Sequence, residues 1–375
     1  MPNASKEHLP ILVHHIGSLG DTLASIPALR SIRSHFPSAQ IHIVFDVQGD
    51  LRAAAIDVIR PLGLADEYIP YDHQTSVGGR MASYYRLWKQ LTPRSYSQVI
   101  SLLPSSRSRM SLWRDKLFYG LAGVWKSPTF KFVKFAADCQ LKEAQRRLLR
   151  LSQIGIRPPA PGAYTIEVPI ETDQKMQLWL QERRRLPDKP LIAICPGAKT
   201  RACIWPLDRF LDLGKKLLAA ECEILLLGGS EHAGDAQRLL SAWNSGIDGV
   251  GQLSIFETAS VLKRCAFMIG VDTGTTHLSA AVGTHCLAIF SQRETSPRWE
   301  PMGEGHQVIR HPVPCQDCRL AVCNTPGHPC LTGTTVETVL ERALQMLASG
   351  PTHTYSRPPG LVFIANAKAA AQSGT

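Results

Sequence analysis

Short apolar runs alternate with amphipathic stretches along most of the 375-residue chain. The first run, at 9–17, ends in glycine and predicts a buried strand. Apolar residues spaced three and four apart then predict a helix over 21–35, and the next apolar run predicts a strand at 40–45. The rest of this half predicts a strand at 98–103 and helices around 50–60, 80–91 and 142–154.

The same alternation restarts beyond a proline-rich stretch at 155–170, a composition that resists regular structure. Strands are predicted at 190–195, 223–229, 266–272 and 286–290. Helices are predicted at 171–185, 207–220, 231–243, 256–264, 275–282 and 335–348. This order is typical of α/β proteins with parallel sheets covered by helices on both faces. We therefore expect two Rossmann-like domains, at 1–160 and 161–350, whose sheets face each other across a cleft, and a tail at 351–375.

Basic residues are unevenly distributed between the two halves. Residues 1–160 contain 21 Lys and Arg against 11 Asp and Glu, whereas 161–375 contain 20 of each, so the net charge of +10 comes from the first half. The most basic stretch, 80–150, has 15 basic and 3 acidic side chains. Such a run is either an ordinary solvated face or a surface for a polyanion, such as a phosphorylated glycolipid, an anionic membrane or a nucleic acid. Charge alone does not choose among these.

The sequence contains no uncharged apolar run of about 18 residues, which argues against a membrane-spanning helix. The first residues lack a basic leader followed by a long apolar core, so they do not resemble a signal peptide. We therefore expect a cytoplasmic protein. Ten cysteines are compatible with this expectation, because six of them are scattered and most of these lie in apolar surroundings, as small core residues do.

The turn after the first predicted strand contains Gly17, Ser18, Gly20 and Asp21. Glycines let the backbone turn sharply and approach a ligand, and the helix that begins near Asp21 adds amide donors and a positive dipole end. Asp21 can equally serve as a cap for that helix, which is the usual role of an aspartate in this position. The residues themselves leave both roles open.

Three loops of the second half carry groups that suit a diphosphate, a ribose or another polar ligand. The groups are Lys199, Thr200 and Arg201 in the first loop, Glu231 in the second, and Asp272, Thr273, Gly274 and His277 in the third. Basic side chains suit a diphosphate, and a carboxylate accepts hydrogen bonds from ribose hydroxyls. An ordinary exposed loop explains the first equally well, and a first-turn helix charge explains the second better. The third has too many hydrogen-bonding groups for a simple cap, which favours a ligand site.

Four cysteines are clustered near the end of the second half, at Cys315, Cys318, Cys323 and Cys330. In a reducing compartment such a cluster suggests a structural Zn²⁺ site rather than disulfides. The spacing is not that of two CxxC knuckles, so a compact loop whose thiols need no metal is the competing interpretation.

Taken together and in this order, these segments resemble glycosyltransferase family 9, the ADP-heptose:lipopolysaccharide heptosyltransferases. The matching segments are GSLGDTLASIPALRSIRSHFP, PGAKTRACIWPLDRF, LLLGGSEH and GVDTGTTHLSAAVGT, while CQDCRLAVCNTPGHPC is similar to the heptosyltransferase II branch. The resemblance covers about residues 11 to 348 and implies the GT-B fold.

The resemblance also implies roles for the candidate residues. Asp21 takes the place of the family's general base beside the glycines of the first turn, which line the acceptor side. Asp272, with Thr273, Gly274 and His277, takes the place of the donor-binding segment, and Glu231 is expected at the adenosine ribose. One departure stands out: where the family often has a lysine for the donor's phosphates, this chain has Cys203. Lys199 or Arg201 would then have to supply the positive charge.

The function implied by the resemblance is an inverting transfer of heptose from ADP-heptose to the lipopolysaccharide inner core, with no cofactor required for catalysis. The implied partners are a nucleotide-sugar donor and an anionic lipid-linked oligosaccharide, with peripheral attachment at the inner face of the cytoplasmic membrane; no nucleic-acid partner is expected. Two alternatives stay open. One is a GT-B transferase that uses another nucleotide sugar on a different glycan or a protein, and the other is an inactive nucleotide-sugar-binding homologue.

Overall fold

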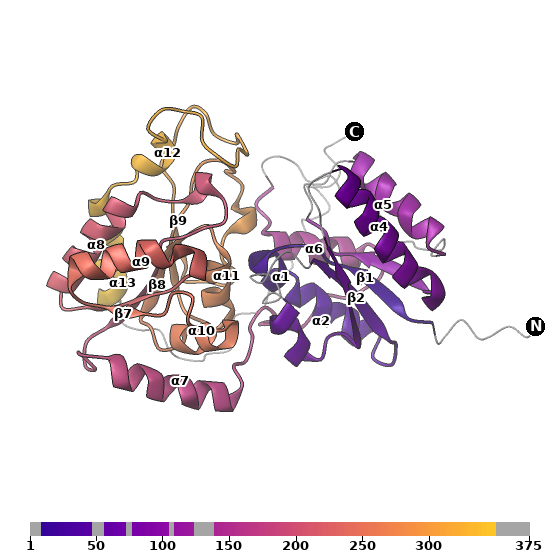
Figure 1. The fold of residues 1–375 in the computed structure, drawn as a ribbon, viewed down its shortest axis with the longest axis horizontal. Helices are drawn as coiled ribbons and strands as arrows, with labels where there is room; N and C mark the ends of the chain where they lie inside the picture. The colour runs from indigo at the N-terminus through magenta and orange to yellow at the C-terminus, as the bar shows by residue number, and fades with distance from the viewer. Residues whose placement is uncertain (1–8, 47–55, 73–76, 105–108, 124–138, 350–375) are drawn as a thin grey trace, which may run out of the picture. The chain divides into compact units, whose positions relative to one another are not determined.

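The computed structural model describes residues 9–46, 56–72, 77–104, 109–123 and 139–349. The chain divides into two compact units, one ending at Tyr164 and the other beginning at Thr165, and each is described by itself (Figure 1). The helix predicted around 50–60 lies only partly within the described residues, and the tail at 351–375 lies outside them.

The first unit is built on a parallel sheet with the strand order β3-β2-β1-β4. The strands are β1 (Ile11–His14), β2 (Ile41–Asp46), β3 (Glu67–Tyr71) and β4 (Gln98–Ser101). Three of them were predicted; β3 was not, because this edge strand contains a proline, which weakens the sequence signal for a strand. The chain proceeds from β1 outward to β3 and then returns to the other side of β1, so the turn after β1 lies where the strand order reverses.

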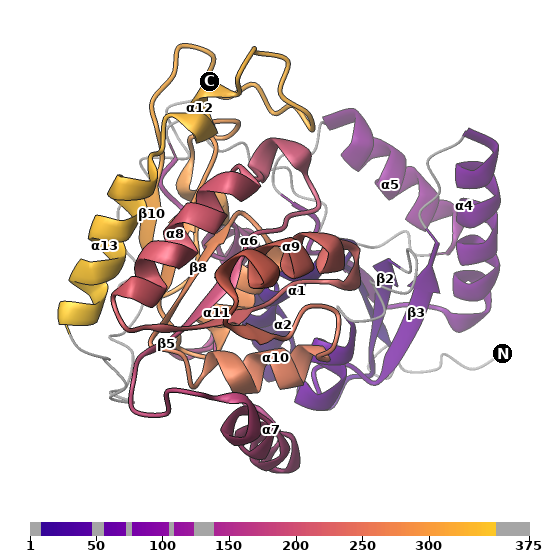
Figure 2. The same ribbon diagram turned by 60° about the vertical axis from the view of Figure 1, so that its left-hand side comes forward.

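The helices of this unit are α1 (Leu19–Leu23), α2 (Ile26–His35), α4 (Val77–Leu91), α5 (Arg109–Leu121) and α6 (Glu143–Ser152). The single helix predicted over 21–35 is two helices, and Pro27 occupies the first turn of the second one, where its missing N–H costs nothing. Buried side chains of α4 and the end of α5 pack with alternate strand residues in one core cluster. Helices α2 and α6 pack together. Figure 2 shows α4 and α5 apart from α2.

The second unit contains a parallel sheet of six strands in the order β10-β9-β8-β5-β6-β7. Its strands are β5 (Leu191–Cys195), β6 (Glu223–Leu226), β7 (Ile247–Asp248), β8 (Phe267–Val271), β9 (Cys286–Ile289) and β10 (Gln307–Ile309). The four central strands were predicted, and only the short edge strands β7 and β10 were missed. Strand order reverses between β5 and β8, and in open parallel sheets ligands bind at the carboxyl ends of strands beside such a reversal.

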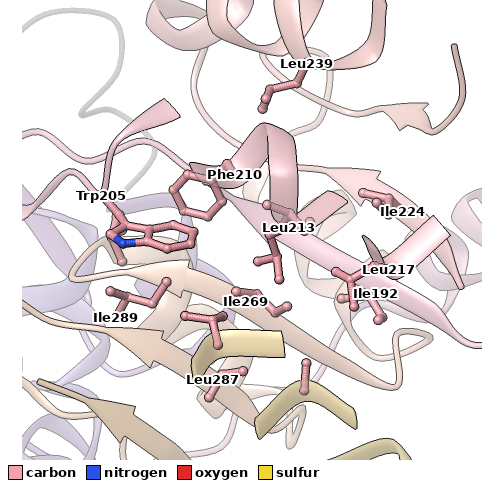
Figure 3. Close-up of a cluster of buried hydrophobic side chains, with 14 of the residues drawn as sticks. Ile192, Trp205, Phe210, Leu213, Leu217, Ile224, Leu239, Ile269, Leu287 and Ile289 are labelled. Carbon is pink, nitrogen blue, oxygen red and sulfur yellow. The ribbon is translucent and has the colours of Figure 1, made fainter. Parts of the chain in front are cut away.

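Two groups of helices accompany this sheet. The first group is α8 (Leu207–Ala219), α9 (Ala233–Trp243) and α13 (Val336–Ala348), and the second is α7 (Ile170–Arg183), α10 (Ile255–Leu262) and α11 (Gly274–Ala281). The first group packs on alternate strand residues in a core that surrounds the fully buried Trp205 (Figure 3). The indole N–H of Trp205 donates to the carbonyl of Thr334 at 3.0 Å, so its one polar atom is satisfied.

No helix within the described ranges has the length and apolar composition needed to cross a bilayer. The predicted helices at 80–91, 142–154, 171–185, 207–220, 231–243, 256–264, 275–282 and 335–348 are all present, with ends shifted by a few residues.

Candidate active site

The turn after β1 holds Asp21 in a fixed orientation. Ser18 precedes α1 and donates to Asp21 Oδ2 from its backbone N–H at 3.0 Å and from its hydroxyl at 3.1 Å. A Cβ on Gly17 would lie 2.3 Å from the Asp21 Cβ, so a glycine is needed where the carboxylate folds back over the turn. Gly20 is buried in the first turn of α1. The side chain of Asp21 is 19% exposed, so it caps the helix and still presents carboxylate surface to solvent.

A fully buried arginine of α6 hydrogen-bonds to this turn. Arg147 Nη1 donates to the backbone carbonyl of Asp21 and to the hydroxyl of Ser25, both at 2.7 Å. Its Nη2 lies 3.6 Å from Asp21 Oδ1, and its Nε lies 3.5 Å from Glu143 Oε1, a carboxylate that is itself buried. Buried charges persist in proteins when they are paired and hydrogen-bonded. Arg147 therefore links α6, through Glu143, to the turn that carries Asp21.

His15 belongs to the same buried network. Its Nε2 lies 3.0 Å from the Thr22 hydroxyl, and its Nδ1 lies 3.3 Å from the Ser25 hydroxyl. Burial, with a smaller contribution from the charge of Arg147, lowers the pKa of His15 to about 3. His15 is therefore neutral at physiological pH and orders two hydroxyls instead of exchanging protons.

The sequence pattern did not identify Arg147 as part of the site, and the basic stretch 80–150 was interpreted as one surface. This interpretation is wrong for Arg146 and Arg147, which are both buried. Arg146 donates from Nε to the carbonyl of Leu141 at 2.9 Å and from Nη2 to that of Cys139 at 3.0 Å. These two arginines order the interior of the first unit and are not available to a polyanion.

The predicted donor residues of the second unit lie at one edge of its sheet. The loops that follow β6, β5, β8 and β9 meet there because these strands are parallel neighbours. The loop after β6 contains Glu231, and the loop after β5 contains Lys199, Thr200 and Arg201. Asp272, Thr273, Gly274 and His277 follow β8. The edge includes the position where strand order reverses.

Glycines bring the loops after β5 and β6 into direct contact. A Cβ on Gly197 would lie 2.3 Å from the ring of His232, so the imidazole packs against this glycine. A Cβ on Gly229 would lie 2.1 Å from a carboxylate oxygen of Glu231, whose Oε1 is 3.7 Å from His232 Nε2. Gly197 thus leaves room for the His232 ring, whereas at Gly229 the exposed carboxylate of Glu231 could move aside for a side chain. Glu231 remains largely exposed, as are Lys199 and Arg201 of the adjoining loop.

Asp272 follows β8 directly and is the most perturbed carboxyl group at this edge. Burial raises its pKa to about 6, and the positive charge of Arg293 is the largest opposing effect. The Cys203 thiol donates to Asp272 Oδ2 at 3.7 Å. Burial and the Asp272 charge raise the pKa of Cys203 to about 12, so it is a neutral thiol. Cys203 therefore supplies a weak hydrogen bond here and no charge.

The start of α11 completes the third loop. Thr273 is the residue that precedes the helix, Gly274 is its first residue, and the Thr276 hydroxyl donates to the carbonyl of Val271 at 2.7 Å. His277 is buried, with its ring centroid 6.3 Å from that of Trp299 in an edge-on arrangement. The helix N-terminus and half-buried polar groups at this position suit an anionic ligand.

The four clustered cysteines line one small cavity together with Ala202, Arg293 and His328. Within the described part of the chain, however, no three His, Cys, Asp or Glu side chains are arranged closely enough to hold a metal ion. The thiols of Cys315, Cys318, Cys323 and Cys330 thus share a site without forming the predicted zinc-binding group in this structure. The other six cysteines are buried, as expected of small core residues.

The model of glycosyltransferase family 9, described as heptosyltransferase, matches residues 84–328. This chain belongs to that family. Lipooligosaccharide heptosyltransferase 2 of Haemophilus influenzae is 21% identical over 198 residues, which are 51% of this chain and 57% of that protein, so the match spans just over half of its length. Lipooligosaccharide heptosyltransferase 2 of Campylobacter jejuni is 21% identical over 353 residues, 90% of this chain and 98% of that protein.

A solved structure of the family has the same fold as this chain. The structure of E. coli ADP-heptose lps heptosyltransferase II is similar with a TM-score of 0.65 at 18% identity, covering 91% of this chain and 99% of that one. The expected GT-B fold, with two Rossmann-like parallel sheets, is therefore confirmed for this family 9 glycosyltransferase.

Proposed function

We propose that this family 9 member is an inverting lipooligosaccharide heptosyltransferase that transfers heptose from ADP-heptose to the inner core of lipopolysaccharide. The observation that carries the proposal is the pairing of two features within one family member. The first unit presents a rigidly held, partly exposed carboxylate, Asp21, and the second gathers polar loops at the reversal of its sheet. The names of the Haemophilus, Campylobacter and E. coli relatives support the sugar and the acceptor class.

The donor is proposed to bind at the carboxyl edge of the second sheet. Glu231 would accept hydrogen bonds from the ribose hydroxyls, since its carboxylate is exposed beside His232. The amide end of α11, with Asp272, Thr273 and Gly274, would hold the diphosphate and the sugar. His277 and the basic side chains of Lys199 and Arg201 complete the proposed donor set.

Asp21 is proposed to act as the general base. In direct displacement, the carboxylate removes the proton from the acceptor hydroxyl while the hydroxyl oxygen attacks the anomeric carbon of the donor sugar. The nucleoside diphosphate leaves from that carbon. Base catalysis of this kind contributes typically about 10²–10⁴-fold to the rate. The two hydrogen bonds from Ser18 fix the orientation of the carboxylate in advance, which removes part of the entropic cost of reaching the reactive geometry.

Cys203 is the observation that favours an alternative function. Its neutral thiol occupies the position where many family members have a lysine, so this chain would bind a different nucleotide sugar or bind a donor without transferring it. Calorimetric titration with ADP-heptose, UDP-sugars and GDP-sugars distinguishes the donors. Donor consumption with and without a lipid-linked core acceptor then separates a transferase from a binding protein. Tight binding of ADP-heptose with acceptor-dependent release of ADP is the result expected from the proposed function.

An anionic membrane surface is the proposed location of the acceptor. Helices α4 and α5 pack together, with Tyr84 and Phe118 at a ring distance of 5.1 Å and the Trp88 indole N–H donating to the Leu121 carbonyl at 3.2 Å. Their outer surface contains large exposed apolar side chains: Met81, Tyr85, Met110, Trp113, Leu117 and Leu121. It also contains the exposed basic side chains of Arg86, Lys89, Arg114 and Lys116. This combination suits a peripheral contact with anionic lipid.

A further inference from the structure

The donor edge of the second sheet has no positive charge at the position of Cys203, and the basic side chains of the same loop, Lys199 and Arg201, are exposed. Cys203 is neutral and points its thiol at Asp272. A nucleoside diphosphate bound beside Asp272 would therefore meet a carboxyl group and a thiol, neither of which neutralises phosphate. Anionic ligands of this charge are normally held by arginine, by lysine or by a metal ion.

Arg293 is fixed at this edge by the backbone of the cysteine loop, residues 315–330. Its Nε donates to the carbonyl of Leu320 at 3.0 Å, and its Nη2 donates to the carbonyl of Arg319 at 3.1 Å. The loop is itself anchored next to Arg293, since the amide of Arg319 donates to the Arg293 carbonyl at 3.0 Å. The guanidinium is therefore held before any ligand arrives, which reduces the entropy lost on binding.

The neighbours of Arg293 place it close to Cys203 and Asp272. Arg293 follows β9, and Asp272 follows β8, the parallel neighbour in which Val271 pairs with Ile289. Arg293 and Ala202, the residue before Cys203, line the same small cavity. The amide of Ala202 also donates to the carbonyl of Ala321 at 3.0 Å, so the loop that holds Arg293 also holds the loop of Cys203.

Arg293 differs from nearby arginines in lacking a carboxylate partner. Arg298 Nη1 lies 3.4 Å from Glu294 Oε1, and Arg310 forms an ion pair with Glu300. Among the described residues, no carboxylate lies within ion-pair distance of Arg293, and its Nη1 has no hydrogen-bond partner. The guanidinium is thus hydrogen-bonded to neutral carbonyls and acts on Asp272 only beyond ion-pair distance, so its positive charge remains available to an anion.

We propose that Arg293 binds the diphosphate of the donor, in place of the lysine that the family often has where this chain has Cys203. The cysteine loop serves to position this arginine. The inference rests on the proposed function, because it requires a nucleoside diphosphate donor. It gives the loop of Cys315, Cys318, Cys323 and Cys330 a role in donor binding that requires no metal ion.

Titration calorimetry of the full chain with ADP and with adenosine tests this role. Arg293→Gln is expected to weaken ADP binding about 10- to 100-fold, the loss typical of a charge-assisted hydrogen bond, and to leave adenosine binding within about twofold. Arg293→Lys keeps the charge without the two-carbonyl fork and should fall between wild type and Arg293→Gln. Arg319→Gln is the matched control, because it removes an exposed charge from the same loop while keeping its carbonyl, and its ADP affinity should stay within about twofold of wild type.

Thermal unfolding of each variant is recorded alongside, so that a misfolded protein is recognised by loss of adenosine binding as well as of ADP binding. If Arg293→Gln binds ADP as tightly as wild type, or loses ADP and adenosine affinity equally while Arg293→Lys does the same, Arg293 is not the phosphate ligand. If the wild-type chain binds no ADP at all but binds UDP or GDP, the same comparison is made with that nucleotide and its nucleoside. Failure of all three nucleotides would overturn the proposed function together with this inference.

Discussion

Asp21 both caps α1 and presents carboxylate to solvent, and the two roles make different predictions for its replacement. Asp21→Asn keeps an acceptor for the Ser18 N–H and hydroxyl but cannot take a proton. We expect turnover to fall about 10²–10⁴-fold, with the Kd for the nucleotide-sugar donor unchanged. Steady-state kinetics and calorimetry on the same preparation measure both quantities.

Ser18→Ala is the matched control for that substitution. It removes the 3.1 Å hydrogen bond from the hydroxyl and leaves the 3.0 Å bond from the backbone N–H. Its turnover should fall far less than that of Asp21→Asn, since the base is retained and only part of its orientation is lost. Near wild-type turnover in Asp21→Asn would show that another group accepts the proton.

Arg147 is expected to matter for the stability of the first unit. Arg147→Met removes the guanidinium that pairs with the buried carboxylate of Glu143, and removal of one member of a buried ion pair costs about 3–5 kcal/mol. The double variant Arg147→Met with Glu143→Leu removes both charges and should regain a large part of that loss. Urea unfolding followed by circular dichroism measures the two free energies. Equal destabilisation of the single and double variants would contradict the importance of the pair.

The raised pKa of Asp272 predicts how the stability of the folded chain changes with pH. Its folded-state pKa of about 6 lies above the ordinary value of 3.8, so between these values the folded chain keeps a proton that the unfolded chain releases. This contribution to stability is complete below about pH 4 and is lost as pH rises through 6. Asp272→Asn does not titrate, so its Tm should exceed that of wild type at pH 7 by more than at pH 4. An offset in Tm that is constant from pH 4 to 7 would exclude this explanation.

Sequence patterns predicted the strands, helices and turns whose signals come from residues close together in the chain. The central strands β5, β6, β8 and β9 are continuous apolar runs in the sequence. The glycine-containing turns were predicted from residues that are adjacent in sequence. The short strands β7 and β10 have too few residues to show a period. The polar loops around Asp21 in the first unit and around Asp272 in the second were also predicted, because each lies between a strand and a helix.

Residues that act across long sequence distances escaped prediction. Arg147 contacts the Asp21 turn from 126 residues away, and no motif near it in sequence identifies that turn as its partner. A usable signal did exist: Arg147 lies on the stripe of α6 formed by Ala144, Leu148 and Leu151, all of which are buried. A charged residue on an apolar helical stripe predicts a buried partner. Arg293 offered no such signal, because its partners are backbone carbonyls of a distant loop.

Helices α4 and α5 present exposed apolar side chains that we expect to contact lipid. Trp113, which is 66% exposed, should insert at the lipid interface, so Trp113→Ser is expected to weaken binding to phosphatidylglycerol vesicles about tenfold. Leu178→Ser in α7 is the control, since Leu178 is a similarly exposed apolar residue, at 61%, on a helix of the other unit. Vesicle co-sedimentation measures both variants. Equal losses for the two, or equal binding to uncharged phosphatidylcholine vesicles, would refute a specific anionic membrane face.

At the scale of the whole chain, charge and chemistry are divided between the two units. The excess of basic residues lies entirely within residues 1–160, where 21 Lys and Arg meet 11 Asp and Glu, while 161–375 are balanced at 20 of each. Arg146 and Arg147 are buried and contribute to internal order, yet the exposed basic side chains of α4 and α5 remain. A long-range attraction is therefore expected for an anionic acceptor and much less for the donor.

This division predicts different responses of the two substrates to salt. Attraction between exposed charges is screened over about 10 Å at 0.1 M ionic strength and over about 3 Å at 1 M, so added salt should raise the KM for a phosphorylated acceptor. The KM for the nucleotide sugar should change less, because the contacts proposed for Arg293 and the start of α11 with the diphosphate are at short range, where screening is weak. Initial rates measured over a range of sodium chloride, with each substrate varied in turn, give the two dependences. A donor KM that rises as steeply as the acceptor KM would mean that both substrates depend on the same long-range field, and the assignment of acceptor and donor to separate units would fail.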